Sequence, residues 1–286
     1  MKVNACAKIN LFLDITGIRQ DGYHTLEMIM QSVSLCDEVR VSLSDNGITV
    51  YTEGIEQEKN IAYRAAKAFF EKTGIQGGLE VHIEKKIPMQ AGLGGGSADA
   101  AAVLLCANEL FGNPLSEEEL LLLGNTVGAD VPFALKGGTA LAKGTGDELA
   151  DIENRLACAY VIVKPEGGVN TKEAFSLFDR TKKQGGGDLS ACVASLEHAD
   201  INAFAKNAYN ALEPAAKLLC PEINGALTGL LADPDVKCAF MTGSGSACVG
   251  ICEDEAAAYR VKSRLEEKNL QVFIAKNTDK GILPAI

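Results

Sequence analysis

Apolar and polar residues alternate along several short segments of the chain, which is the pattern of half-buried β-strands. The segments 8–16 and 79–84 are apolar at every second position. Further strands are predicted from apolar and β-branched content at 38–43, 47–52, 139–142, 158–163, 237–242, 248–252 and 272–275. Asp45-Asn46-Gly47 lies between two of these segments and predicts a hairpin that joins 38–43 to 47–52.

Helix starts are marked by residues that cap free backbone N–H groups. Ser116 is followed three residues later by Glu119, which is the pattern of a capping box. Predicted helices begin at the capping residues Asn60, Ser97, Ser116 and Asp254 and run to about residues 72, 111, 127 and 268. Gly74 is expected to stop the first of them.

Strands and helices are mixed along the whole chain, so the sequence predicts an α+β fold with a boundary near residue 150. After that boundary the predicted order is strand, helices, two strands, helix and strand. This order is compatible with a ferredoxin-like layer. Gly185-Gly186-Gly187 is expected to interrupt the helical part of this half.

A glycine-rich segment, Pro88-Met89-Gln90-Ala91-Gly92-Leu93-Gly94-Gly95-Gly96-Ser97, connects the strand 79–84 to the apolar helix that follows. Glycines allow backbone N–H groups to approach an anion, and a helix N-terminus adds free N–H groups and a positive dipole end. The segment matches neither the Walker A loop nor the dinucleotide-binding pattern. From these residues alone, a phosphate cradle and an ordinary tight turn both remain open.

Composition narrows the class of protein. The 286 residues are 47% apolar, without a run of about 18 apolar residues that would suggest a membrane span. The first residues lack the long apolar stretch of a signal peptide, so the protein is expected to be cytoplasmic. The nine cysteines form no Cys-x-x-Cys pair and accompany only three histidines, which predicts reduced, mostly buried thiols rather than a zinc site.

The net charge of −11 argues against a nucleic-acid partner, because such binding needs a positive surface. It leaves room for a small phosphorylated ligand. Lys8, Lys85 and Lys86 are candidates to offset the overall negative field at one pocket.

Four further segments change the interpretation of the glycine-rich segment. They are Ala7-Lys8-Ile9-Asn10-Leu11-Phe12-Leu13, Asp21-Gly22-Tyr23-His24-Thr25-Leu26, Gly128-Ala129-Asp130-Val131-Pro132-Phe133 and Met241-Thr242-Gly243-Ser244-Gly245-Ser246-Ala247. Together with Pro88–Ala98 they occur in the order seen in the GHMP small-molecule kinases, and the resemblance covers nearly the whole chain. The pairing of Lys-Ile-Asn-Leu-x-Leu with Asp-Gly-Tyr-His resembles the branch that acts on a cytidyl diphosphate ester of a branched polyol.

This resemblance implies a two-domain fold. Residues 1–152 would form an ATP-binding domain similar to domain 2 of ribosomal protein S5. Residues 153–286 would form a ferredoxin-like domain that binds the substrate. The implied activity is ATP- and Mg²⁺-dependent phosphorylation of the polyol's 2-hydroxyl in isoprenoid precursor biosynthesis.

The resemblance also assigns catalytic residues. Asp130, in a turn that Pro132 helps to stop, would accept the proton of the acceptor hydroxyl, and Lys8 would keep that carboxylate ionised. From the residues alone, an Asp in such a turn is more often an ordinary turn or capping residue, and a lone strand lysine such as Lys8 is usually a solvated or edge residue.

Nucleotide contacts are implied for Asn60, Lys85, Pro88, Met89, Gln90, Ala91, Gly92, Leu93, Gly94, Gly95, Gly96, Ser97 and Ala98. Without the resemblance, Asn60 is a cap and Lys85 a surface charge. Ser97 either caps its helix or contacts phosphate or metal through its hydroxyl, and no other metal ligand is assigned.

Substrate contacts are implied for Tyr23 and His24, which would recognise the cytosine ring, and for Phe175, which would lie on the ring's other face. Thr171 and Asn10 complete this set, with Asn10 holding substrate near Lys8. A buried tyrosine and a structural histidine are the alternative. Two other functions stay open: a GHMP kinase for another alcohol, such as mevalonate or homoserine, and a catalytically inactive nucleotide-binding protein.

Overall fold

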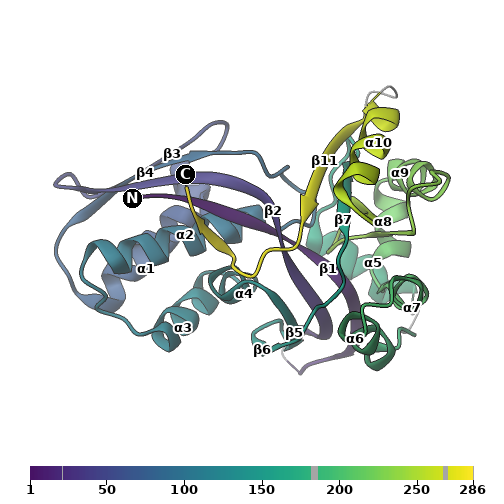
Figure 1. The fold of residues 1–286 in the computed structure, drawn as a ribbon. Coiled ribbons are helices and arrows are strands. Elements are labelled where there is room, and N and C mark those ends of the chain that lie inside the picture. The colour runs from purple at the N-terminus through teal and green to yellow at the C-terminus, as the bar shows by residue number, and fades with distance from the viewer. Residues whose placement is uncertain (21, 182–185, 267–269, 286) are drawn as a thin grey trace.

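Two β-sheets, each with helices packed on it, build the molecule (Figure 1). The computed structural model describes residues 1–20, 22–181, 186–266 and 270–285, so that Asp21, Gly185 and the predicted helix end at 267–268 lie outside it. Within these ranges no helix is long and apolar enough to cross a membrane.

The first sheet has the strand order β12-β1-β2-β4-β3, with β5 and β8 pairing with β2 and β1 and with β6 pairing with β5. Its strands are β1 (Lys2–Ile18), β2 (His24–Ser44), β3 (Ile48–Thr52), β4 (Gly78–Glu84), β5 (Thr139–Gly144), β6 (Glu148–Asp151), β8 (Tyr209–Asn210) and β12 (Ile282–Pro284). The two long strands β1 and β2 form one antiparallel hairpin that runs through both halves of the molecule (Figure 1).

Two sequence predictions for this sheet need correction. The strand that was predicted only over 38–43 begins already at His24, because the whole of β2 is held by pairing with β1. The predicted hairpin between 38–43 and 47–52 is wrong, because β4 lies between these strands. β3 instead pairs with β4 in parallel, as a strand–helix–strand crossover requires.

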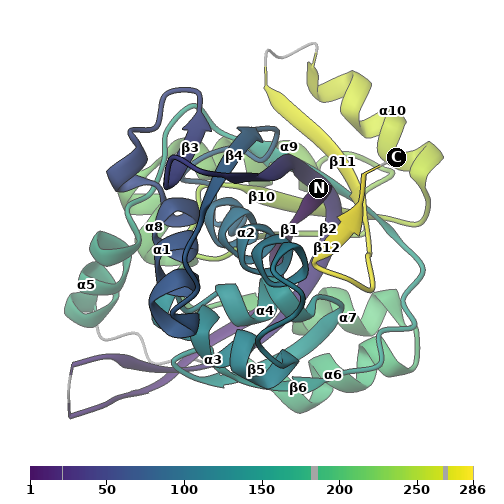
Figure 2. The ribbon, with the colours of Figure 1, turned by 90° about the vertical axis from the view of Figure 1, so that its left-hand side faces the viewer.

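Four helices pack together beside the first sheet: α1 (Ile61–Thr73), α2 (Gly95–Leu110), α3 (Glu117–Val127) and α4 (Val131–Lys136) (Figure 2). The predicted cap at Asn60 is confirmed, since its side chain accepts a hydrogen bond from the Ala62 N–H. The capping box at Ser116 is also confirmed. Ser97, however, is not an N-cap: α2 begins two residues earlier, after Gly94.

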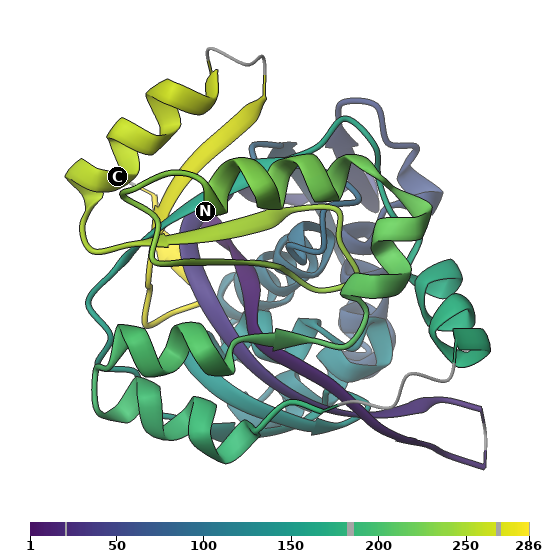
Figure 3. The same cartoon turned by 90° about the vertical axis from the view of Figure 1, so that its right-hand side faces the viewer.

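The second sheet has the order β11-β7-β10-β9, with all neighbours antiparallel. Its strands are β7 (Ala159–Lys164), β9 (Cys238–Met241), β10 (Cys248–Cys252) and β11 (Gln271–Lys276). The helices of this half are α5 (Thr171–Thr181), α6 (Leu189–Glu197), α7 (Ile201–Asn207), α8 (Glu213–Leu219), α9 (Glu222–Leu231) and α10 (Glu255–Glu266) (Figure 3). When these four strands are numbered 1 to 4 in chain order, their order in the sheet is 4-1-3-2. Helices connect β7 to β9 and β10 to β11, as predicted for a ferredoxin-like layer.

The second sheet is covered on both faces, which explains why β7 is an unbroken apolar run. Tyr160 and Ile162 belong to the apolar core shared with the first sheet. Val161 and Val163 belong to a second apolar cluster that includes buried residues of α9 and α10. Successive side chains of a strand point to opposite faces, so both faces need apolar residues here.

The second half of the chain also contributes strands to the first sheet. β8 and β12 follow residue 152 in the chain, yet both pair with β1 in the first sheet. The division of the chain at 152 therefore stays a prediction. The chain's last described strand completes the edge of the first sheet beside β1 (Figure 1).

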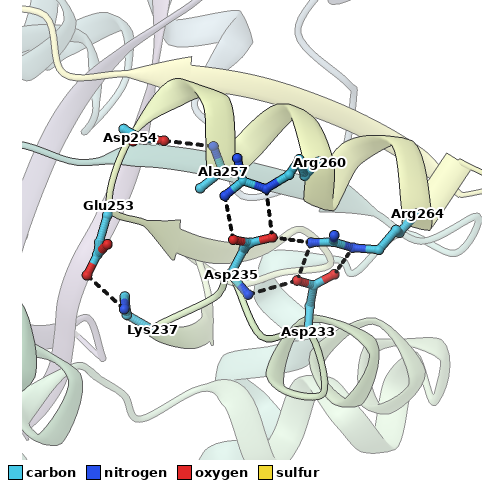
Figure 4. A network of polar contacts seen from close by, with 8 residues as sticks. All are labelled: Asp233, Asp235, Lys237, Glu253, Asp254, Ala257, Arg260 and Arg264. Atoms are coloured by element: carbon cyan, nitrogen blue, oxygen red, sulfur yellow. Dashed lines mark hydrogen bonds and ion pairs between the residues drawn. The ribbon is translucent and has the colours of Figure 1, made fainter.

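Helix α10 is attached to the turn before β9 by a network of charged side chains (Figure 4). Arg264 donates two hydrogen bonds to Asp233, at 2.7 and 2.8 Å, and one to Asp235 at 2.5 Å. Arg260 binds Asp235 through two more, at 2.6 and 3.1 Å. Asp254 caps the backbone at the start of the helix, as the sequence predicted.

Candidate active site

A cavity of about 1210 Å³ is lined by residues from both halves of the molecule. The glycine-rich segment, the catalytic candidates and the substrate candidates all line this one cavity, with the exception of Ala98. Ala98 is buried inside α2, where its N–H donates to the Gly94 carbonyl. The structure thus brings together residues that the sequence places far apart.

The glycine-rich loop approaches β1 closely. The Lys8 N–H donates to the Leu93 carbonyl at 3.0 Å. Gly94 has φ of +68°, and a Cβ there would lie 2.9 Å from Cγ of Lys8. Glycine is therefore required both by the backbone conformation and by the space. Helix α2 begins directly after Gly94. The backbone N–H groups of its first turn have no carbonyl acceptor within the helix.

Lys8 and Asp130 lie side by side in the cavity. The Lys8 ammonium is 3.5 Å from an Asp130 carboxylate oxygen and donates to the Asn10 side chain at 2.7 Å. Lys8 is buried, with 9% of its surface exposed, whereas about a third of the Asp130 side chain is accessible. Asp130 occupies the N-cap position of α4, yet its side chain makes no capping bond. The carboxylate is thus free of the capping role that the sequence left open.

Pro132 has a different role from the one predicted. It stands in the first turn of α4, two residues after Asp130, and belongs to the start of that helix rather than ending a turn. Proline is well suited to this position because its missing N–H would have no intrahelical partner there.

A buried ion triad beside the loop escaped the sequence analysis. Lys85 pairs with Asp99 at 2.6 Å and also with Asp37. Burial raises the pKa of the Asp99 carboxyl to about 7, against the attraction of Lys85 and with repulsion from Asp37. Burial alone would lower the pKa of Lys85, but the two carboxylates outweigh it and raise that pKa. Lys85 is therefore held as an ammonium.

The triad places this ammonium at the start of α2. A Cβ on Gly95 would lie 3.3 Å from the Lys85 Nζ atom. One oxygen of Asp99 is buried without a hydrogen-bond partner in the described part of the chain. The sequence did carry a signal for this triad: Asp99 is a charged residue within an apolar helical run, and a buried carboxylate needs a cationic partner.

The substrate candidates gather where the β1–β2 hairpin meets α5. His24 contacts Asp179 at 2.8 Å, and its ring centroid is 4.7 Å from that of Phe175. These two rings leave no space for a third ring between them. Tyr23 is 67% exposed and lines the same cavity.

A second glycine-containing loop closes the cavity from the other half. Thr171 at the start of α5 and Ser244 share a hydrogen bond of 2.9 Å. A Cβ on Gly92 would lie 2.3 Å from the Thr242 carbonyl oxygen, and the Ala247 N–H donates to the Ala91 carbonyl. The loop at 242–247 is thus packed against the glycine-rich loop.

Comparison with known proteins identifies the class. The model of the GHMP kinases N terminal domain matches residues 60–138, and that of the GHMP kinases C terminal domain matches residues 192–270. The chain belongs to the GHMP kinases and has their two-domain fold; it is a small-molecule kinase.

Within that class, two relatives of high coverage share one name. The 4-diphosphocytidyl-2-C-methyl-D-erythritol kinase of Desulfitobacterium hafniense (strain Y51) is 43% identical over 97% of this chain and 96% of its own length. That of Clostridium botulinum (strain Eklund 17B / Type B) is 38% identical over 96% and 99%. A crystal structure of 4-(cytidine 5'-diphospho)-2C-methyl-D-erythritol kinase superposes with a TM-score of 0.83 at 31% identity, covering 97% of this chain and all of that one. The chain falls in this branch of the family.

Proposed function

We propose that this kinase transfers the γ-phosphoryl group of ATP to the 2-hydroxyl of 4-diphosphocytidyl-2-C-methyl-D-erythritol, giving the 2-phosphate and ADP in isoprenoid precursor biosynthesis. The observation that carries the proposal is the arrangement along one cavity. The Lys8–Asp130 pair lies beside the glycine-rich loop, and Tyr23, His24 and Phe175 line the same cavity. The names of the relatives support the same substrate.

Phosphoryl transfer depends on positioning and on neutralising charge more than on covalent chemistry by the protein. In the proposal, the N–H groups at the start of α2 and the Lys85 ammonium face the nucleotide, and Asn60 lies near its base. Asp130 accepts the hydroxyl proton as the new P–O bond forms. Lys8, whose ammonium lies 3.5 Å from that carboxylate, stabilises the negative charge that develops during the transfer.

Mg²⁺ belongs to the proposal as the ion that ATP carries. The described residues contain no group of three histidine, cysteine or acidic side chains suited to hold a metal. The Ser97 hydroxyl lines the cavity in the first turn of α2 and offers one oxygen donor of the type that Mg²⁺ prefers. When bound, the ion would neutralise charge on the transferring phosphates. We also propose that the enzyme acts in the cytoplasm.

The test is a coupled ADP-release assay with Mg-ATP and three acceptors: the cytidyl substrate, mevalonate and homoserine. We expect rapid release with the cytidyl substrate alone, little release without an acceptor, and a loss of about 100-fold or more in kcat for Asp130→Asn. Asp151→Asn is the matched control, because Asp151 also forms an ion pair with a lysine, Lys136, but does so on the surface. Release with another alcohol would reassign the substrate, and no release with any would favour an inactive nucleotide-binding protein.

A further inference from the structure

Two cysteines face each other across the β1–β2 hairpin. Cys6 and Cys36 are direct cross-strand partners, and their sulfur atoms are 2.8 Å apart. Cys6 is buried, whereas Cys36 is partly exposed. All nine cysteines are thiols in this structure, and this is the pair whose sulfurs the fold brings into direct contact on neighbouring strands.

The backbone around this pair suits a covalent link. The Cys6 N–H donates to the Gly281 carbonyl at 2.8 Å, on the side of β12, so it points away from β2. Cys6 and Cys36 are therefore a non-hydrogen-bonded pair, in which opposed Cα atoms lie about 4.5 Å apart. That spacing falls within the roughly 4.4–6.8 Å found for disulfides. Next to the pair, β2 bulges by two residues, Ser34 and Leu35, which leaves its backbone room to adjust.

The contact between the two thiols makes Cys6 the more acidic of the pair, because the hydrogen bond with Cys6, together with burial, raises the pKa of Cys36. Hydrogen bonds from Cys36 and then from Thr278 lower the pKa of Cys6, although burial opposes them. A thiolate is the form that attacks a disulfide. Partial exposure of Cys36 gives an external oxidant access to one member of the pair.

We propose that Cys6 and Cys36 form a reversible intramolecular disulfide by exchange with a low-molecular-weight disulfide. Cys36 reacts first because it is the member of the pair that a reagent can reach. Its thiol loses its proton, and the resulting thiolate attacks the reagent's S–S bond, forms a mixed disulfide and releases one reagent thiolate. The Cys6 thiolate then attacks the Cys36 sulfur and releases the second. The two cysteine protons end on the two released thiols, so the protein is oxidised by two electrons and the reagent is reduced by two.

The link would act on the nucleotide end of the cavity through the next residue, Asp37. One Asp37 oxygen accepts hydrogen bonds from the N–H groups of Lys86 and Ile87, at 2.5 and 2.8 Å, and the other pairs with Lys85. Closing the sulfurs from 2.8 Å to the covalent length of about 2.05 Å draws Cys36 toward β1. Asp37 moves with Cys36, which alters its hydrogen bonds to Lys86 and Ile87 and its ion pair with Lys85, in the segment that leads into the glycine-rich loop. This consequence, unlike the disulfide itself, rests on the proposed ATP site.

The first test reads the covalent state of the full chain. The reduced protein is equilibrated in buffers of increasing ratio of oxidised to reduced glutathione, free thiols are alkylated, and tryptic peptides are weighed. We expect peptide 3–8 linked to peptide 20–40 with the loss of two hydrogens, reversed by dithiothreitol. Cys6→Ser and Cys36→Ser should abolish the linked peptide, while Cys158→Ser, at the other partly exposed cysteine, should retain it. Alkylation of both wild-type thiols at the most oxidising ratio, or a stable glutathione adduct on Cys36 alone, would overturn the proposal.

The second test measures ATP affinity of the oxidised and the re-reduced protein. We expect a several-fold weaker affinity after oxidation in the wild type and Cys158→Ser, and no change in Cys36→Ser. A linked peptide with unchanged affinity would overturn the route through Asp37. Absence of ATP binding by the reduced protein would instead count against the proposed function, whatever the state of the cysteines.

Discussion

Lys8 is a charged residue in the part of β1 that is buried from Ala5 to Leu13, and it is buried itself. Its two side-chain partners hold it in place. Asn10 fixes the ammonium from the same strand, and Asp130 approaches it from the start of α4. A buried ammonium that contacts a carboxylate of which about a third is accessible is suited to hold charge at a reacting centre. The alternative of a solvated edge lysine does not fit this burial.

We predict that Lys8→Ala lowers kcat by about 100-fold or more while KM for ATP changes only a few-fold, because the lost charge acts on the transition state. Steady-state kinetics with both substrates varied measure this split. Lys136→Ala removes a lysine from the surface Lys136–Asp151 pair and should leave kcat near the wild-type value. Near-normal turnover of Lys8→Ala would remove Lys8 from the mechanism.

At the scale of elements, the glycine-rich loop is defined by what it contacts on either side. One side touches the Lys8 side chain at Gly94, and the other touches the Thr242 backbone at Gly92. A tight turn that served only to connect β4 to α2 would need neither contact. The loop is therefore a layer between the first sheet and the loop at 242–247.

Gly94→Ala tests this close contact, and Gly112→Ala is its matched control. Both glycines have positive φ, at +68° and +80°, but a Cβ on Gly112 would meet nothing within 4 Å. We expect each substitution to cost about 1–2 kcal/mol of unfolding free energy from backbone strain. ATP affinity and kcat should fall only in Gly94→Ala, where the new methyl displaces Lys8. Urea unfolding and steady-state kinetics give the two readouts, and equal losses of activity in both variants would contradict the prediction.

At the scale of the whole molecule, the two sheets share an apolar core, and the chain after residue 152 supplies β8 and β12 to the first sheet. Within the second half, the network on α10 contributes to stability in a pH-dependent way. Arg260 and then Arg264 lower the pKa of Asp235 from its ordinary value of 3.8. A lowered pKa means that the contribution is complete above about pH 3.8 and is lost as the pH falls through the folded-state value.

We therefore predict that Asp235→Asn lowers the melting temperature at pH 7, and that the difference from wild type narrows as the pH drops below about 4. Melting curves from pH 7 to pH 3 measure it. Asp45→Asn, at an exposed position in the turn after β2, gives the baseline for a neutral substitution. A difference that stays constant, or grows, toward pH 3 would show that Asp235 does not act through this ion pairing.

The sequence by itself determined the family, the α+β class and three of the four helix starts that it predicted, because these depend on local signals. Asn60, Ser116 and Asp254 cap their helices as predicted, since a cap involves only the next few residues. The residues that the sequence assigned to the site all line one cavity, with the exception of Ala98. Their catalytic and binding roles stay predictions.

Only the tertiary structure decided which strands pair and which charges meet. β4 lies between β2 and β3 and pairs with β3 in parallel. Parallel pairing needs a crossover connection, and the local turn signal at Asp45-Asn46-Gly47 carries no information about that pairing. Helix α2 begins after Gly94, before the predicted start at Ser97, and Gly94 lies against the Lys8 side chain. Asp37 and Asp99 joined Lys85 from separate elements, and Cys6 met Cys36 through strand register. Such contacts depend on distances between remote segments, and those distances exist only once the sheets have packed.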